Sequence, residues 1–172
     1  MTSPKSSVMI ADTCIIIDFK RADPTLFSII SRTLGPLSIP ETLLEELEKE
    51  FSKDIISDIK NLGIDIVPVY LADLTMATKE SQTGPLSVYD RVCFYTAKRW
   101  GYTCITNDKK LRAECRQHKV QVLWGLEIIV QLYQNHGITR KEARRIGNAI
   151  YTNSHGRITR EIYEHFLSII KK

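Results

Sequence analysis

The stretch Leu86–Arg112, LSVYDRVCFYTAKRWGYTCITNDKKLR, decides how this chain is expected to fold. Its first half begins with the S-x-x-D spacing of a helix capping box and predicts a helix that ends at Gly101. The residues that follow predict a short buried strand and then the start of another helix. One aspartate, Asp90, lies in the first turn of the first helix, and another, Asp108, lies just past the strand. Acids at the ends of neighbouring elements can converge on one site.

Segments typical of strands and of helices alternate on both sides of this stretch. Apolar, β-rich runs predict strands at residues 8–11, 37–40, 64–69, 102–106 and 120–124. Amphipathic or capped segments predict helices from Cys14 onward and at residues 24–34, 41–51, 54–62, 71–80, 88–100, 109–118, 125–135, 139–150 and 159–170. This alternation predicts an α/β fold in three layers, with a central parallel sheet of four or five strands flanked by helices.

The bulk composition indicates a soluble globular protein. A chain of 172 residues with 26% charged residues suits one domain with a small extension. No apolar run approaches the roughly 20 residues that a membrane span needs, and the N-terminus lacks the pattern of a secretion signal, so we expect a cytoplasmic protein that does not bind membranes. The four cysteines form no C-x-x-C pair and are expected to be small buried side chains rather than zinc ligands.

The positive charge is concentrated near the C-terminus. The net charge is +4, and residues 137–172, with eight Lys and Arg against three Asp and Glu, carry +5. Such a segment suits contact with phosphates or with an acidic partner, and it equally suits a solvated helix face. Basic residues that could steer a polyanion are Lys109, Lys110, Arg112 and Arg116 beside Asp108, and Arg140, Lys141, Arg144 and Arg145 in the tail.

Several common nucleotide and hydrolase motifs are missing from the sequence. It contains no G-x-G-x-x-G, no P-loop and no G-x-S-x-G elbow. What remains is a set of acids at element ends: Asp12 after the first strand, Glu46 beside the apolar stripe of its helix, Asp90 and Asp108. Sites in parallel sheets form beyond the carboxyl ends of the strands, where Asp12 and Asp108 are expected. Clustered carboxylates suit Mg²⁺ or Mn²⁺, which can hydrolyse a phosphodiester, with Thr13, Thr106 and Asn107 orienting the ligands.

Each acid also has a purely structural interpretation. Asp12 could cap the turn after the first strand, and Glu46 could lie on a solvated helix face. Asp90 could serve only as the capping-box partner of Ser87, and Asp108 only as the N-cap of the next helix. A single acid is therefore a weak signal, and the joint occurrence of four is stronger.

The sequence resembles the PIN-domain family of nucleases over roughly residues 8–124. The matching blocks are Ile10-Ala11-Asp12-Thr13, Pro40-x-x-Leu43-x-x-Glu46-Leu47, Leu86-Ser87-x-x-Asp90 and Ile105-Thr106-Asn107-Asp108-x-x-Leu111-Arg112. The remaining C-terminal part, with its G-I-T turn and its last helix, resembles a prokaryotic subgroup related to the VapC toxins. One position departs from the family pattern: Cys14 stands where many members have asparagine, which is expected to remove one polar group beside the acids.

The resemblance implies a PIN-like nuclease domain at residues 1–136 and a C-terminal helical extension, residues 137–172, packed on the same domain. It also implies an endoribonuclease that depends on Mg²⁺ or Mn²⁺, with Asp12, Glu46, Asp90 and Asp108 as catalytic and metal-binding residues. RNA would be the substrate, and the protein would form a homodimer and would be inhibited by an antitoxin protein. The alternative is a catalytically inactive module of the same fold that binds RNA or another protein.

Overall fold

The computed structural model describes residues 8–48, 51 and 54–171, and within them five strands form one sheet in which all neighbours run parallel. The strands are β1 (Met9–Ala11), β2 (Leu37–Pro40), β3 (Ile64–Val67), β4 (Thr103–Ile105) and β5 (Val122–Leu123). Their order across the sheet is β3-β2-β1-β4-β5. The α/β fold with a parallel sheet of four or five strands, predicted from the sequence, is confirmed.

Helices connect the strands and continue beyond the last one. Those before β4 are α1 (Thr13–Ala22), α2 (Leu26–Thr33), the 3-10 turn η1 (Glu41–Leu43), α3 (Leu44–Leu47), α4 (Ile55–Asn61), α5 (Leu71–Ser81) and α6 (Val88–Trp100). Those after β4 are α7 (Lys109–Gln117), α8 (Gly125–Gln134), α9 (Arg140–Asn153) and α10 (Arg160–Lys171). No helix within the described ranges has the length and apolar composition that crossing a membrane requires.

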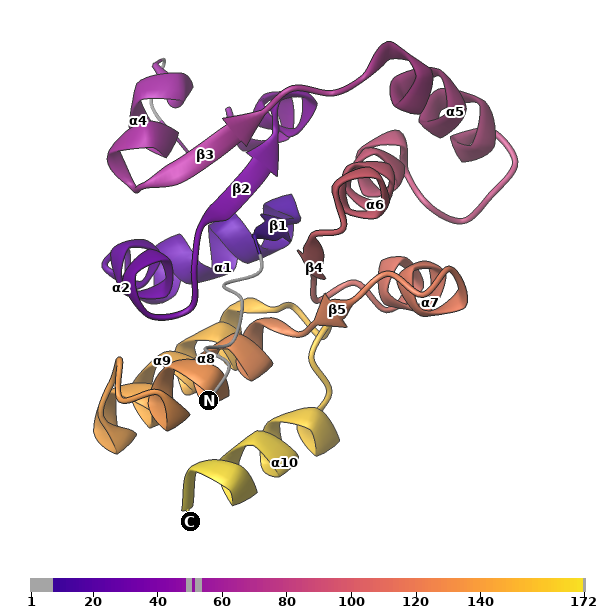
Figure 1. Ribbon diagram of the computed structural model, residues 1–172. Coiled ribbons are helices and arrows are strands. Elements are labelled where there is room, and N and C mark those ends of the chain that lie inside the picture. Colours follow the sequence, from indigo (N-terminus) through magenta and orange to yellow (C-terminus); the bar gives the residue numbers. More distant parts are fainter. Residues whose placement is uncertain (1–7, 49–50, 52–53, 172) are drawn as a thin grey trace, which may run out of the picture.

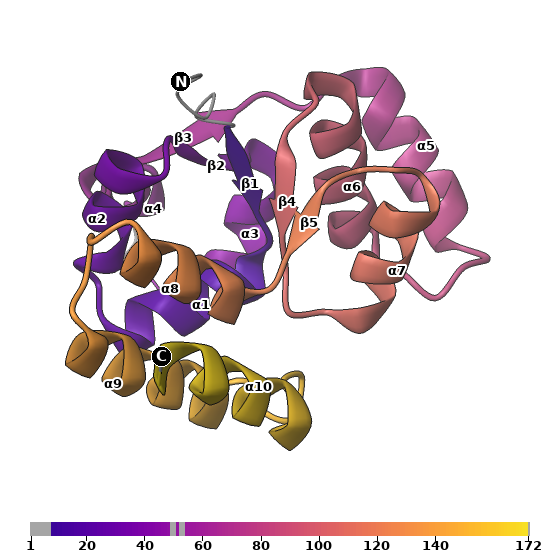
Figure 2. The ribbon, with the colours of Figure 1, turned by 60° about the horizontal axis from the view of Figure 1, so that its bottom comes forward.

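The elements form three layers, with the sheet between two layers of helices (Figures 1 and 2). Helices α5, α6 and α7 lie together on one side of the sheet, and α1, α2, α8 and α9 lie on the other. The three central strands are buried on both faces, because every residue of β1, β2 and β4 is buried. Buried parallel strands are rich in apolar residues, as β1 is throughout and β2 and β4 are in part, which is why these short segments could be located from the sequence.

The strand order reverses beside β1. From β1 the chain goes on to β2 and β3 on one side, and it later returns to place β4 on the other side. The ends of β1 and β4 are in register, since the backbone N–H of Asp12 donates to the carbonyl oxygen of Ile105 at 3.0 Å. In doubly wound sheets the crevice for a ligand opens where the order reverses, beyond the carboxyl ends of the strands. Residues that follow β1 and β4 therefore border this crevice.

The helix predicted for residues 41–51 is shorter and less regular than expected. It consists of η1 followed by the single turn of α3, and residues 49–50 of the expected helix lie outside the described part. Glu45 follows Glu41 by four residues and precedes Glu48 by three, so like charges repel one another along the helix surface. The prediction of a regular helix over the whole segment was wrong, although Leu43 and Leu47 are buried as its apolar stripe predicts.

The C-terminal helices pack against the rest of the fold. Helix α9 contacts α1 and α8, and α10 contacts α8 and α9 (Figure 2). The close contact between α9 and α10 depends on Gly147, because a Cβ atom there would lie 2.3 Å from the ring of Phe166. This contact gives the last helix a fixed position along α9.

Candidate functional site

Asp12 lies at the centre of the candidate site, at the carboxyl end of β1. Its backbone occupies the N-cap position of α1, but its side chain makes no capping hydrogen bond to the helix. Its carboxylate instead accepts from the hydroxyl of Thr106 at 2.8 Å and from the thiol of Cys14 at 3.0 Å, both at Oδ2. The Thr13 hydroxyl lies 3.3 Å from the other oxygen, Oδ1. The interpretation of Asp12 as a simple cap is therefore wrong.

Glu46 approaches the same place from α3. The Thr13 hydroxyl, whose oxygen is 3.0 Å from Oε2 of Glu46, lies between Glu46 and Asp12. The neighbouring Glu45 points to a different partner and accepts a hydrogen bond from the Tyr89 hydroxyl at 3.1 Å. Although Glu46 is exposed at the surface, a single hydroxyl group, that of Thr13, thus bridges its carboxylate and the carboxylate of Asp12.

Asp90 takes part in the capping box at the start of α6. Its Oδ2 accepts from the backbone N–H and from the hydroxyl of Ser87, at 2.9 Å and 2.8 Å. In return, the backbone N–H of Asp90 donates to the Ser87 hydroxyl. Both capping hydrogen bonds on the carboxylate use the same oxygen atom, so the capping role and a role as a ligand are compatible.

Asp108 caps α7 directly after β4. Its Oδ1 accepts from the backbone N–H groups of Lys110 and Leu111, each at 2.8 Å. Its own N–H donates to the Thr106 hydroxyl at 3.0 Å. Because the same hydroxyl donates to Asp12, Thr106 connects the two acids that follow β1 and β4.

Electrostatic repulsion connects the four acids. Partial burial, followed by the negative charges of Asp12 and Asp90, raises the pKa of Glu46 above its usual value, although the Thr13 hydroxyl opposes the shift. Burial, with the charges of Asp12 and Asp108, likewise raises the pKa of Asp90, against the opposing hydrogen bond from Ser87. The structure thus brings Glu46 and Asp90 within electrostatic reach of each other and of Asp12, and Asp90 also within reach of Asp108.

Cys14 contributes more than its sequence position suggested. Burial and the nearby Asp12 carboxylate raise the pKa of its thiol well above the usual value, so the thiol stays protonated and donates a hydrogen bond to Asp12. The expectation that cysteine removes a polar group from the site was therefore wrong, since a hydrogen-bond donor is still present. Cys93, Cys104 and Cys115 are fully buried free thiols, as their apolar surroundings predicted.

Asn107 lies beside the site without contacting the four acids. Its side-chain N–H group donates to Asp18 at 3.1 Å, and its oxygen accepts from the backbone N–H of Gly125 at 3.0 Å. Asp18 is fully buried and also accepts from Arg157, which belongs to the turn between α9 and α10. Burial raises the pKa of Asp18, although Arg157 opposes the shift. Asn107 therefore fixes the turn that carries Asp108, rather than orienting a ligand directly.

The basic residues beside Asp108 divide into two groups. Lys109, Lys110 and Arg116 are exposed, whereas Arg112 is 2% exposed and its guanidinium group lies over the Trp124 ring, 3.9 Å from the ring centroid. The inclusion of Arg112 among residues that could steer a polyanion was wrong. In the tail, Arg145 pairs with Asp23 at 2.5 Å, while Arg140, Lys141 and Arg144 remain on the surface.

The four acids do not form a finished metal site. Within the described ranges, no group of three or more His, Cys, Asp or Glu side chains could hold a metal ion as the side chains stand.

The chain matches no model of a known protein family, and no curated protein matches its sequence.

Proposed function

We propose that this protein is a metal-dependent endoribonuclease of the PIN type. The observation that carries the proposal is the convergence of four carboxylates, from four different elements, at the place where the strand order reverses. Two of these acids, Glu46 and Asp90, have pKa values raised partly by the charges of their neighbours. Such repulsion costs stability in the free protein, and a bound cation would relieve it.

The donor set fits Mg²⁺ or Mn²⁺. All four acids offer hard carboxylate oxygens, which these ions prefer to sulfur or imidazole ligands. Asp12, Glu46, Asp90 and Asp108 would hold the ion, and their side chains would have to draw closer together around it. When bound, the ion would activate a water molecule and neutralise charge that develops on the phosphate oxygens.

The residues around the acids have separate tasks in this proposal. The Thr106 hydroxyl holds the Asp12 carboxylate and the Asp108 backbone at a fixed separation, and the Thr13 hydroxyl does the same between Asp12 and Glu46. Exposed Lys109 and Lys110 at the start of α7 attract the phosphates of the substrate. Water attacks the phosphorus, the bond to the 3′-oxygen breaks, and the products carry a 3′-hydroxyl and a 5′-phosphate.

RNA cleavage in the presence of Mn²⁺ tests the proposal. We expect the wild-type protein to cut single-stranded RNA and to leave 5′-phosphate ends, and we expect Asp108→Asn to lose most of that activity. Asp65→Asn makes the same change of charge at an exposed position of β3 and should cut at the wild-type rate. Equal cleavage by wild type and Asp108→Asn would refute the assignment, as would products with 5′-hydroxyl ends.

A second candidate is a module of the same fold that binds RNA or another protein without cutting it. It is favoured by the absence, within the described residues, of a group of acids that could hold a metal ion without moving. Only the nuclease proposal predicts that Mn²⁺ stabilises the protein, because a ligand that binds only the native state raises its stability. The subgroup resemblance would further make the nuclease the toxin of a toxin–antitoxin pair, acting as a homodimer.

A further inference from the structure

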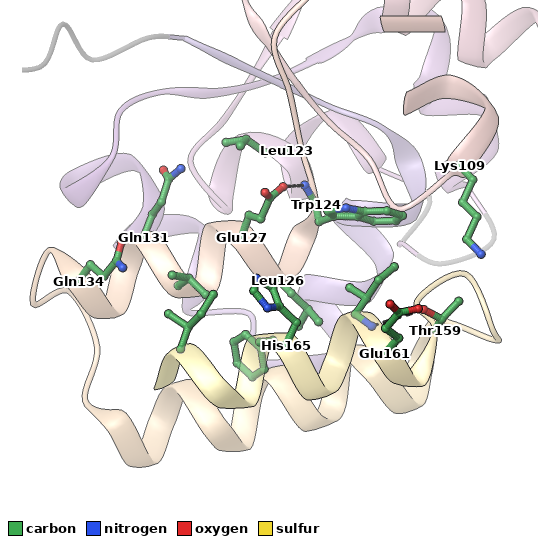
Figure 3. A pocket seen from close by; sticks show the side chains of 14 residues that line it. Lys109, Leu123, Trp124, Leu126, Glu127, Gln131, Gln134, Thr159, Glu161 and His165 are labelled. Atoms are coloured by element: carbon green, nitrogen blue, oxygen red, sulfur yellow. Dashed lines mark hydrogen bonds between the residues drawn. The ribbon is translucent and has the colours of Figure 1, made fainter. Parts of the chain in front are cut away.

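A groove of about 700 Å³ lies between the end of β5, α8 and α10 (Figure 3). Apolar side chains such as Leu126, Val130 and Phe166 line its interior, and polar groups such as Gln131 and Gln134 line its rim. In Figure 3 the Trp124 ring lies at one end of the groove, above the beginning of α10 and beside Lys109. The groove thus combines an apolar interior, a flat aromatic ring and a cation at its mouth.

This end of the groove adjoins the turn that carries Asp108. Lys109, which lines the groove, directly follows Asp108 in the chain. On the other side of the mouth, the backbone N–H of Gly125, next to Trp124, donates to the Asn107 side chain at 3.0 Å. Both walls of the mouth are therefore tied to the turn after β4 that carries Asp108.

A buried cation lies over the Trp124 ring. The Arg112 guanidinium lies 3.9 Å from the ring centroid, and Arg112 is one helical turn after Asp108. Arg112 also pairs with Glu127 at 3.8 Å, while two of its other nitrogens, Nε and one terminal nitrogen, are buried without a hydrogen-bond partner among the described residues. The ring is therefore one of the two partners that hold this cation. Trp124 is half-buried and lines the groove, so part of its ring is open to a ligand in the groove.

We propose that the groove binds an unpaired base of single-stranded RNA, stacked on the face of Trp124 that lines the groove. This inference rests on the proposed nuclease function and assigns a subsite for its substrate. Bases of any sequence stack on aromatic side chains in single-strand binding proteins. The phosphate attached to the base would lie at Lys109, on the way to Asp108. A phosphate is not expected inside the groove, because Glu127 and Glu161 line it and would repel an anion.

The fluorescence of two single-tryptophan variants tests this assignment. The chain has two tryptophans, and Trp100 lies at the far end of α6 from Asp90, 44% exposed. Trp100→Phe therefore reports on Trp124 alone, and Trp124→Phe reports on Trp100 alone. Each variant is titrated, in the presence of a chelator, with a short single-stranded RNA and with a sugar-phosphate strand of the same length that lacks bases.

We expect the RNA to quench the fluorescence of Trp124 in Trp100→Phe, with little quenching by the strand without bases and little change in Trp124→Phe. We also expect Trp124→Leu to bind labelled RNA roughly tenfold more weakly than wild type. Equal quenching by the two strands would overturn the proposal, as would quenching of Trp100 alone. If Trp124→Leu does not fold, the comparison of the two Phe variants still decides.

Cleavage assays with Mn²⁺ on the same preparations separate this proposal from the nuclease assignment. RNA cleavage without quenching of Trp124 would refute the base subsite and leave the nuclease assignment in place. Quenching of Trp124 by RNA without any cleavage would support the base subsite and refute the nuclease assignment.

Discussion

Replacing Thr106 by valine removes the single hydroxyl that connects Asp12 and Asp108. The side chain is fully buried, and valine has nearly the same shape, so the change creates no cavity. It removes a hydrogen bond to a carboxylate, at 2.8 Å, and the acceptor of the Asp108 N–H, at 3.0 Å. These losses cost roughly 1.5–3 and 0.5–1.5 kcal/mol, so the free energy of unfolding should fall by about 2–4 kcal/mol. For a chain of this length the melting temperature should fall by roughly 5–15 °C.

Thermal unfolding followed by circular dichroism, without divalent metal, measures this change, and Thr103→Val is the matched control. Thr103 is also buried and begins β4, the strand that Thr106 directly follows, but its hydroxyl donates to the neutral side-chain oxygen of Gln121 at 3.2 Å. The control should lose only about 1 kcal/mol. If Thr106→Val is no more destabilised than Thr103→Val, the Thr106 hydroxyl does not hold the two acids together.

Three further substitutions test the raised pKa of Glu46, the ion pair of Arg157 with Asp18 and the packing of α10 on α9. The raised pKa of Glu46 means that the folded state holds the Glu46 proton more tightly than the unfolded state, so the free energy of unfolding falls as the pH rises from about 4 through the raised pKa. Without metal, Glu46→Gln should therefore have a higher melting temperature than wild type at pH 7. Equal melting temperatures at pH 7 would contradict this expectation. Arg157→Leu leaves buried Asp18 without its cation, so the free energy of unfolding in urea at pH 7 should fall by about 3 kcal/mol. Adding Asp18→Asn should restore most of that free energy, and a double variant no more stable than Arg157→Leu would assign the loss to another contact. Gly147→Ala places its Cβ 2.3 Å from the Phe166 ring, so thermal unfolding should show a net loss of about 1–2 kcal/mol despite the better helix propensity of alanine, and a gain would mean that α10 moves freely on α9.

The fold could be predicted because its signals are local. The strands at the centre of the sheet are short and mostly apolar, and helices both between and after the strands begin at recognisable caps such as Ser87 and Thr139. Alternation of strands and helices favours a parallel sheet, because parallel strands need crossover connections and a helix usually supplies them. The same rule predicts, from the order of the segments alone, that Asp12 and Asp108 lie at one edge of the sheet.

The contacts within the site could be predicted only in part. The capping roles of Asp90 and Asp108 follow from spacings of two or three residues, and the structure has both. The directions of Cys14 and Asn107 depend on which groups the fold brings beside them, and no local pattern encodes that. The pairing of Arg157 with Asp18 joins residues far apart in the chain, so it required the three-dimensional structure.

The position of Trp124 illustrates the same limit. In the sequence it is the last residue of an apolar run and predicts only a buried strand end. In the structure it lies over Arg112 and at one end of a groove beside Lys109. No sequence spacing connects Arg112 with Trp124, because the two residues belong to different elements that only the fold brings together.

The melting temperature in Mn²⁺ shows whether the four acids bind a divalent cation. At a concentration 100 times the dissociation constant, Mn²⁺ should stabilise the wild-type protein by about 2.7 kcal/mol, which raises the melting temperature by roughly 5–10 °C. Asp12→Asn, whose side chain caps no helix, should lose this rise, and the exposed-site control Asp65→Asn should keep it. If the melting temperature of the folded wild-type protein does not change with Mn²⁺, or if Asp12→Asn shows an equal rise, the four acids do not bind the cation.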